Sequence, residues 1–439
     1  MTRCDSRALP LSTCSDLAAA RYRQGIDLLL SAWPGADLAL DEAIAADPDF
    51  ALAHAARARL HAVRAQGEAA RTRIATAAAL ALRHGTPRER SHVEVLSQAI
   101  HGRSAEALRA ALAHVAQWPR DVVVFGLPLG AFGLFAFSGM ADHDQARVDL
   151  CERHAGQFDA DDWWFLTYRG WSQAENGAVA LGLDLTRRGH DARRANANGV
   201  HALAHALFEA GAGGEIERLV AGWLPSYARS GTLHGHIAWH AALAALDRGD
   251  TRQALALHAA HVAPGVSEGL ALNVLTDTVS LLWRIGAYGD EVPAGLWAAA
   301  RAYGAPLHPA AGFAFADVHM AMLDAATGDR AAVERRVAQL GALVEAGTLA
   351  AGPVVPAICR AVLAFADGAY ALCARLLEPM AAELARIGGS GAQREIVEDT
   401  LLVALMRGDE PEKARALLDR RLRRRPSPRD AAWRTRLAP

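Results

Sequence analysis

Lysine is almost absent from this sequence of 439 residues, where Lys413 is the only one. A Schiff-base lysine or a lysine general base elsewhere in the chain is therefore excluded. The sequence also contains no Gly-Lys pair, so a phosphate-binding loop of the GxxxxGK[ST] type is excluded as well.

Paired cysteines and long apolar runs are missing too. The five cysteines are scattered and never occur in CxxC spacing, which favours a reducing compartment and argues against a thiolate zinc site. No run of about 18 uninterrupted apolar residues occurs. Residues 1–16 lack the apolar segment of a signal peptide and are expected to be irregular. The sequence predicts a cytoplasmic protein with no membrane partner.

An excess of positive charge is also lacking. The formal net charge is -2 and the pI is near 6.8, so no overall field favours nucleic acid, and no nucleic-acid partner is predicted. The one basic run, residues 420–425, lies within the basic C-terminal end at 420–439. We interpret this run as a solvated helix end, stabilised by the negative end of the helix dipole.

Aromatic residues make up 6% of the chain, whereas hydrophobic residues make up 52%. A large core can therefore form, and it must be built mainly from Ala, Leu and Val. Alanine has the best helix propensity and lets helices approach closely. This composition favours tightly packed helix pairs.

A repeated pattern of two helices decides the fold class. Residues 21–60 are predicted to form an amphipathic helix that ends near Pro34-Gly35 and a second helix with small residues. An Asp-Pro turn at residues 47–48 follows, and then a third helix begins. This order, with about 34 residues per unit, is typical of tetratricopeptide repeats. The pattern recurs in residues 89–121, 239–258, 315–340, 361–377 and 400–418. We predict an all-α solenoid, a right-handed superhelix of antiparallel helix pairs forming one continuous domain over residues 1–439.

The sequence resembles bacterial members of the tetratricopeptide repeat protein 38 family over most of its length. The strings that carry the resemblance, in this order and spacing, are 201–205 (HALAH), 236–240 (HIAWH), Asp277 with 280–284 (SLLWR), 315–319 (FADVH) and 389–394 (GSGAQR). The resemblance implies the helical-repeat fold and no particular activity. Residues 211–214 (GAGG) depart from the usual helix turn of the family.

Two histidine pairs stand out among the eighteen histidines. His201 and His205 are four residues apart, as are His236 and His240, so each pair lies on one face of a helix. The two pairs are offset by 35 residues, about one repeat, so they should occupy equivalent positions in neighbouring units and line the concave surface. Asp277 follows His240 by 37 residues and Asp317 follows Asp277 by 40, so these acids can continue the same row.

Four interpretations of these histidines remain open. They can satisfy neighbouring groups inside the array, or grip a small polar molecule or peptide together with acids and tryptophans. They can also act in acid–base catalysis, because histidine titrates near neutrality and a carboxylate partner fixes its tautomer. A metal site is the fourth interpretation, although HxxxH lacks the adjacent Glu of the HExxH motif.

The leading hypothesis is a binding scaffold that holds a small polar ligand or peptide in its concave groove, with a homodimer as an open possibility. The alternative is an enzyme that uses groove histidines and acids for acid–base or metal-assisted chemistry. The candidate catalytic residues are His205, His240, Asp277 and Glu209. The candidate ligand-binding residues are His201, His236, Trp239, Trp283, Asp317, His319, Gln393 and Arg394. No residue is assigned to a metal and no cofactor is assigned.

Overall fold

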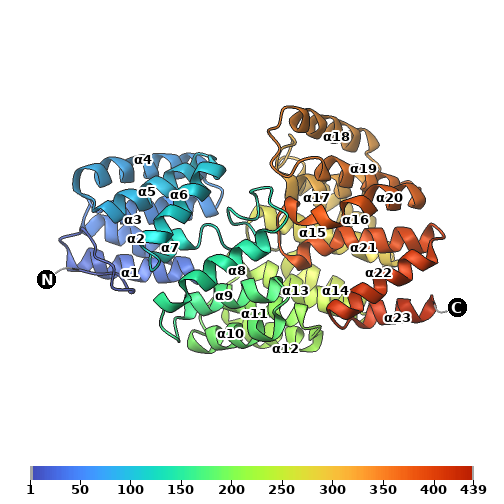
Figure 1. Cartoon of the computed structure of the whole chain (residues 1–439), viewed down its shortest axis with the longest axis horizontal. Helices are drawn as coiled ribbons and strands as arrows, with labels where there is room; N and C mark the ends of the chain where they lie inside the picture. The colour runs from blue at the N-terminus through green and yellow to red at the C-terminus, as the bar shows by residue number, and fades with distance from the viewer. Residues whose placement is uncertain (1–2, 438–439) are drawn as a thin grey trace.

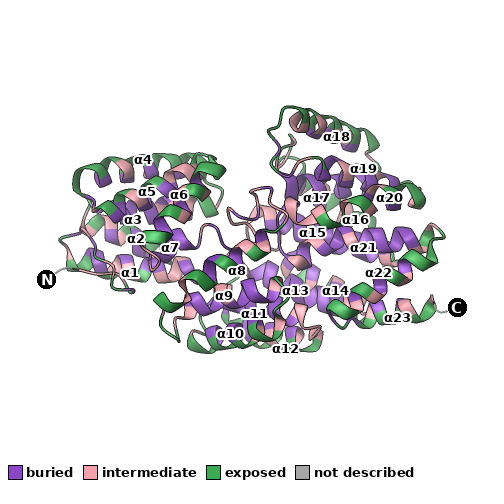
Figure 2. Ribbon diagram, in the orientation of Figure 1, coloured by how far each residue is buried: buried purple, intermediate pink, exposed green. Residues whose placement is uncertain are grey.

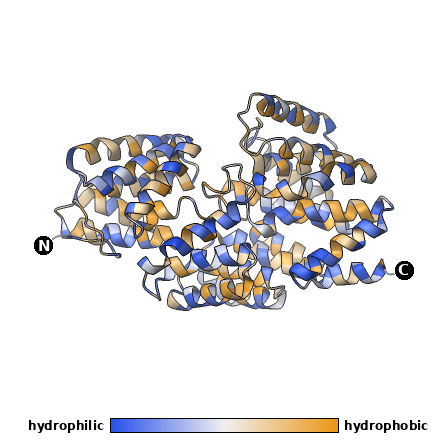
Figure 3. Ribbon diagram, in the orientation of Figure 1, coloured by the Kyte–Doolittle hydropathy of each residue, from blue (hydrophilic) through white to orange (hydrophobic). Residues whose placement is uncertain are grey.

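The computed structural model describes residues 3–437 and contains twenty-three α-helices within that range (Figure 1). No β-strand occurs among these residues, only an isolated bridge between Cys4 and Pro10. The all-α helical-repeat solenoid predicted from the sequence is confirmed. Hydrophilic and hydrophobic stretches alternate along most helices, as expected for amphipathic helices (Figure 3).

The helices are as follows. The first third of the chain forms α1 (Asp16–Leu30), α2 (Ala36–Ala46), α3 (Ala51–Val63), α4 (Gly67–His84), α5 (Pro87–Ile100), α6 (Ser104–Gln117) and α7 (Val122–Phe125). The middle forms α8 (His143–His154), α9 (Trp163–Glu175), α10 (Val179–Ala192), α11 (Ala197–Glu209), α12 (Gly213–Trp223), α13 (His234–Asp247), α14 (Thr251–Leu257), α15 (Ala271–Tyr288) and α16 (Ala294–Gly304). The last third forms α17 (Ala314–Ala326), α18 (Arg330–Glu345), α19 (Val354–Ala366), α20 (Tyr370–Leu377), α21 (Gly391–Arg407), α22 (Pro411–Arg424) and α23 (Pro428–Arg436).

Successive helices pair, and the first helix of each pair packs on the first helix of the next. In the middle of the chain these first helices are α9, α11, α13 and α15, which begin 34–37 residues apart. Small residues permit the close approach within a pair: a Cβ on Gly182 of α10 would lie 2.6 Å from the backbone nitrogen of Ala174 on α9. The first helices of the middle pairs are largely buried, and α13 is buried along almost its whole length (Figure 2).

The glycine-rich segment between α7 and α8 crosses from the N-terminal helices to the C-terminal ones. Phe132 packs edge-on against Phe315 with ring centroids 5.3 Å apart, and the backbone N–H of Gly389 donates to the carbonyl of Ala131 at 3.1 Å. Helix α21 in turn packs against α15. The end of the chain is thereby brought beside its middle.

The basic run at residues 420–425 forms the end of α22, but the prediction that it is solvated is wrong for Arg421 and Arg425, which are buried. Arg421 is 2% exposed and forms ion pairs with Glu395, Glu398, Asp399 and Asp430. The acids on α21 and α23 neutralise the guanidinium, which removes the reason for it to stay in water. Only part of the run, including Arg423, is exposed.

No helix precedes Asp16 among the described residues, so residues 3–15 are non-helical. None of the helices between residues 3 and 437 has the length and apolar character needed to cross a membrane. That the array forms a single domain stays a prediction.

Candidate functional site

Helices α11 and α13 place the four histidines of the two pairs together. Helix α11 begins after Asn196, whose side-chain oxygen accepts the N–H of Gly199 at 3.0 Å and caps the helix. His201 and His205 then lie one turn apart on α11, and His236 and His240 lie one turn apart on α13. Because the two helices pack against each other, the pairs face each other, as the offset of one repeat predicts. We call these four residues the histidine cluster.

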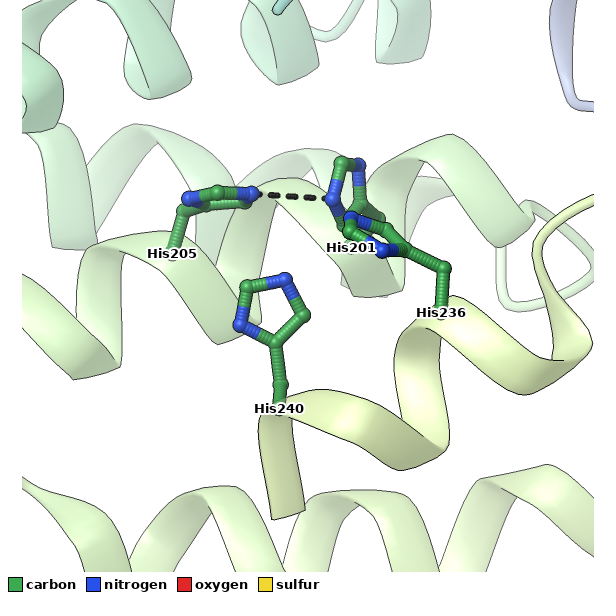
Figure 4. A group of neighbouring side chains, drawn as sticks. All are labelled: His201, His205, His236 and His240. Carbon is green, nitrogen blue, oxygen red and sulfur yellow. Dashed lines mark hydrogen bonds between the residues drawn. The ribbon is translucent and has the colours of Figure 1, made fainter. Parts of the chain in front are cut away.

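The four imidazole rings converge on one small space (Figure 4). Neighbouring ring centroids are 4.4 Å apart for His201 and His205 and also 4.4 Å apart for His205 and His240. Nε2 of His205 lies 2.9 Å from Nε2 of His201. One nitrogen from each ring can be chosen so that all four lie within 4.8 Å of one another.

Two buried carboxylates each accept a hydrogen bond from one histidine of the cluster. Nδ1 of His205 is 3.0 Å from Oε1 of Glu175 at the end of α9, and Nδ1 of His236 is 2.8 Å from Oδ2 of Asp277 on α15. A carboxylate accepts, so in both rings Nδ1 carries the proton and Nε2 presents its lone pair. The carboxylates therefore fix the tautomer of one histidine on each helix.

Burial keeps His201 and His240 uncharged. The pKa values of His201 and His240 lie well below the usual histidine value, because burial penalises the charged form and the neighbouring histidines add repulsion. His240 is fully buried, and neither of its ring nitrogens has a hydrogen-bond partner among the described residues.

The two carboxylates respond differently to burial. Burial raises the pKa of Asp277, although His236 and Arg284 oppose the change. For Glu175, burial acts in the same direction, but the hydrogen bond from His205 and the nearby positive charge of Arg394 help to outweigh it, and the pKa lies below its ordinary value. Glu175 also accepts the backbone N–H of Gly391 at 2.6 Å, which adds to the stabilisation of its ionised form.

The donor set fits a transition metal ion. Neutral imidazole is the common nitrogen ligand of zinc, copper, nickel and iron. A tetrahedral zinc site with bonds of about 2.0–2.1 Å needs nitrogen–nitrogen separations of roughly 3.4 Å. In the histidine cluster the Nε2 atoms of His201 and His205 are 2.9 Å apart, and no two of the four chosen ring nitrogens are more than 4.8 Å apart. The nitrogen–nitrogen distance of a tetrahedral site lies between these values. Metal-binding histidines characteristically donate their second ring N–H to a carboxylate, as His205 and His236 do here.

A cavity of about 130 Å³ borders the histidine cluster at His201 and His236. The crossing segment between α7 and α8 closes one side of this cavity with residues 130–132. Asn273 of α15 and Gln393 of α21 line it as well. A small molecule in this space would lie directly beside two of the four imidazoles.

The structure also shows where the other candidate residues lie. Trp239 is fully buried and stacks on His236 at 5.3 Å, so it packs against the cluster. Gln393 lines the cavity and completes the N-terminal cap of α21 with Ser390. Glu209 is not hydrogen-bonded to any of the four histidines. It lies near Glu175 and Arg425, and burial raises its pKa to about 8.

Four candidates make contacts elsewhere. Trp283 donates to Thr400 at 2.9 Å, and Asp317 pairs with Arg336 at 2.6 Å. Nδ1 of His319 donates to the carbonyl of Phe315, and Arg394 pairs with Asp144 at 2.6 Å. None of these four residues is in the histidine cluster or lines the cavity beside it. The contacts of Trp283, Asp317 and Arg394 each join two helices, whereas the contact of His319 lies within α17.

Glu175 and Asn273 also belong to this region, although they are not among the residues predicted from the sequence. Glu175 precedes His205 by 30 residues and carries no motif, so only the packing of α9 on α11 reveals it. Asn273 precedes Asp277 by four residues and thus lies on the same face of α15, a spacing that could have identified it. The GAGG segment proves to be an ordinary tight turn, because Gly211 adopts a φ of +68° between α11 and α12.

Comparisons with known proteins leave the function open. No family model matches the chain. The crystal structure of yeast Tom70 is similar with a TM-score of 0.31 and 11% identity, covering 92% of this chain and 91% of that one. A structure of Naa15/Naa10 bound to HypK-THB is similar with a TM-score of 0.22 and 12% identity, covering 92% of this chain and 62% of that one.

Proposed function

We propose that the histidine cluster binds a divalent first-row transition metal ion, and that the protein uses this ion in chemistry on a small polar molecule. The observation that carries the proposal is the convergence of four imidazoles, two of them backed by buried carboxylates. Zinc is the reference ion, because it is commonly bound by histidine nitrogens and prefers four ligands.

The charges of the site support a divalent ion. An imidazole that binds a metal through its lone pair contributes no charge, whereas Glu175 and Asp277 together contribute -2 when both are ionised. A divalent cation would therefore be neutralised within a buried region, which lowers the cost of burying it. The same cation would favour the ionised form of Asp277, whose pKa burial alone raises.

The contacts of the ring nitrogens argue against a purely structural role. An unsatisfied buried polar group costs about 1–3 kcal/mol. His240 has two such nitrogens within the described part of the chain. Nε2 of His205 faces a ring nitrogen of His201 and not a group of the protein backbone. A bound ion would give His240 a partner and would take the Nε2 lone pair of His205, which without an ion accepts Nε2–H of His201.

A metal held by three of the four imidazoles would keep one position open, where it would act as a Lewis acid toward a bound oxygen atom or lower the pKa of a bound water. Glu175 and Asp277 would hold His205 and His236 with their Nε2 lone pairs directed toward the ion. The burial of the histidine cluster would exclude bulk water from it. The cavity beside His201 and His236 favours a small molecule over a peptide, since about 130 Å³ holds only a few heavy atoms. A peptide in the concave groove stays a prediction, as do membership of the tetratricopeptide repeat protein 38 family and a homodimer.

The proposal is tested by elemental analysis of untagged protein purified without chelator, followed by titration of zinc into chelator-stripped protein. We expect about one ion per chain. We also expect metal to raise the thermal midpoint, because an ion that binds only the folded state stabilises it by about 2.7 kcal/mol at one hundred times the dissociation constant. The double variant His205→Ala, His240→Ala should lose both effects.

The matched control is His258→Ala, since His258 is also buried but lies outside the cluster. This variant should lose stability and keep its metal. Stripped protein that takes up no zinc, or that binds it equally well in the double variant, would refute the metal site.

A further inference from the structure

A second and larger cavity adjoins the one beside the histidine cluster. It measures about 450 Å³ and is lined by residues of α1, α2, α3, α9 and α11, among others. Four residues line both cavities, namely Tyr168, Asn198, Leu233 and Leu270. Because the two cavities share this part of their walls, they can hold the two ends of one molecule.

Arg59 of α3 brings an unpaired positive charge to the larger cavity. Within residues 3–437 this side chain forms no hydrogen bond and no ion pair. Its Nε is buried, whereas Nη1 and Nη2 are accessible to solvent and are free to bind a ligand. Burial lowers the pKa of the guanidinium, and only Tyr168 opposes this change. A partly buried cation without a counter-charge is costly, so this position favours an anion.

The other charges on the wall of the larger cavity cancel each other. Arg64 and Asp37 line it as well, and Nη1 of Arg64 lies 2.9 Å from Oδ2 of Asp37. One positive charge, that of Arg59, therefore remains. A carboxylate carries one negative charge at neutral pH, whereas a phosphate monoester carries about −1.5 to −2. The charge balance thus favours a carboxylate over a phosphate.

The guanidinium of Arg59 also lies close to the wall of the smaller cavity. Its Nη2 would be 3.9 Å from a Cβ built on Gly126, at the start of the segment that crosses from α7 to α8. Residues 130–132 of the same segment line the smaller cavity. Tyr168 lines both cavities, and Arg59 is near enough to lower its pKa against the effect of burial. An anion bound to Arg59 would therefore lie beside the wall that the two cavities share.

We infer that the molecule taken up beside the proposed metal ion is a small monocarboxylate, whose carboxylate pairs with Arg59 and whose other end enters the cavity beside the histidine cluster. The free Nη–H groups of Arg59 can donate to the carboxylate oxygens, and such charge-assisted hydrogen bonds are stronger than neutral ones. This inference rests on the proposed function, since it names the substrate class of the same site.

The remaining lining of the larger cavity indicates the body of the molecule. Its larger apolar side chains include Leu28, Trp33, Leu60, Val63, Leu233 and Leu270. Removing an aliphatic chain from water against such side chains is favourable. We therefore expect a carboxylate that carries a short apolar chain.

Three probes separate the charge of the molecule from its chain. Hexanoate carries the carboxylate, hexanamide has the same chain without a charge, and pentyl phosphate carries a larger negative charge. Each is titrated into the full chain, zinc-loaded and zinc-stripped, by isothermal titration calorimetry. We expect hexanoate to bind with the highest affinity, and both other probes to bind roughly tenfold or more weakly.

Variants of Arg59 test the assigned charge. Arg59→Met keeps an apolar stem and removes an unpaired charge, so it should fold with an unchanged thermal midpoint or a higher one. It should retain its zinc and bind hexanoate roughly tenfold or more weakly. Arg59→Lys, which keeps the charge, should bind hexanoate more tightly than Arg59→Met. The control Arg71→Met removes the same charge at an exposed position outside the cavity and should bind hexanoate as the unmodified chain does.

The cobalt(II)-loaded chain tests where the other end of the molecule lies. Cobalt(II) belongs to the same series of imidazole-binding ions as zinc, and its unpaired electrons broaden the NMR signals of nearby protons. With hexanoate bound, we expect the terminal methyl signal to broaden more than that of the methylene next to the carboxylate. The reverse order would mean that the carboxylate binds the metal instead of Arg59, and it would overturn the inference.

The outcomes distinguish this inference from the metal site. If hexanamide or pentyl phosphate binds as tightly as hexanoate, the carboxylate assignment is overturned and the zinc content is unaffected. The same holds if Arg59→Met binds hexanoate as the unmodified chain does. If the chain takes up neither zinc nor cobalt, but hexanoate binds and Arg59→Met weakens it, the metal site fails and the carboxylate assignment stands.

Discussion

Glu175 joins His205 to the start of α21: its carboxylate accepts Nδ1–H of His205 at 3.0 Å and the backbone N–H of Gly391 at 2.6 Å. Asp277 likewise accepts Nδ1–H of His236, at 2.8 Å. The two carboxylates thus hold one histidine of each pair, although α9 and α15 lie on opposite sides of α11 and α13 in the repeat order. Removing either carboxylate should weaken metal binding without removing a ligand.

The two carboxylates are expected to differ in their effect on stability. Asp277→Asn should lower zinc affinity about 10–100-fold, as is typical for partners of metal-binding histidines, with little change in thermal midpoint. Glu175→Gln should lower both, because its amide N–H would face the N–H of Gly391. Titration with zinc and thermal melts of the stripped variants check this. Unchanged zinc affinity in both variants would mean that the carboxylates do not support a metal.

Acid should destabilise the stripped protein through its buried neutral histidines. Burial lowers the pKa of both His258 and His319 to about 4. Because the folded pKa lies below the unfolded value of about 6.5, this stabilising contribution is complete above pH 6.5 and is lost as the pH falls toward 4. The shift corresponds to roughly 3 kcal/mol per histidine.

Thermal melts between pH 7.5 and pH 5 measure this effect. His258→Leu should flatten the pH dependence, whereas His84→Gln should leave it as it is, since His84 is exposed. An unchanged pH dependence in His258→Leu would show that this histidine is not held neutral by the fold.

Glu209 should oppose stability at alkaline pH. Burial raises its pKa to about 8, mainly against the attraction of Arg425. The folded state therefore holds a proton that the unfolded chain releases near pH 4.5, and stability is lost as the pH rises from about 4.5 to 8. Glu209→Gln should raise the thermal midpoint more at pH 8 than at pH 5, while Glu68→Gln at an exposed position should do neither. A larger gain at pH 5 would contradict the assigned direction.

Arg421 should be the most sensitive of the C-terminal arginines. It contacts four acids, and loss of one partner in a buried ion network typically costs about 3–5 kcal/mol because charges are left unpaired. Arg421→Met should lower the free energy of unfolding by about this amount, measured by urea denaturation. Arg423→Met, at an exposed position of the same helix, is the control. Equal effects of the two would place the stabilisation elsewhere.

The sequence predicts the histidine cluster because helical spacing and repeat spacing are both local in the chain. An offset of four residues and an offset of one repeat are enough to place four imidazoles in adjacent rows. The burial of Arg421 is not predictable in this way, since it depends on acids that α21 and α23 bring to it. The same applies to Glu175, whose contact with His205 depends on how α9 packs against α11.

Repeat spacing alone does not predict which acids contact the histidines. Asp277 continues the row of the histidines and contacts His236, whereas Asp317, 40 residues further on, pairs with Arg336. Repeat spacing predicts which face of a helix a side chain lies on. Which residue a charged side chain contacts depends on the nearest opposite charge. Trp283 illustrates the same limit, because its indole N–H donates to Thr400 of α21.

The most direct measurement of the central claim is X-ray absorption spectroscopy of the zinc-loaded chain at the zinc edge. The account predicts a first shell of nitrogen at about 2.0–2.1 Å with the outer-shell scattering of several imidazole rings. The His205→Ala, His240→Ala variant should lose that scattering. A shell of oxygen alone, without imidazole scattering, would contradict a metal site in the histidine cluster.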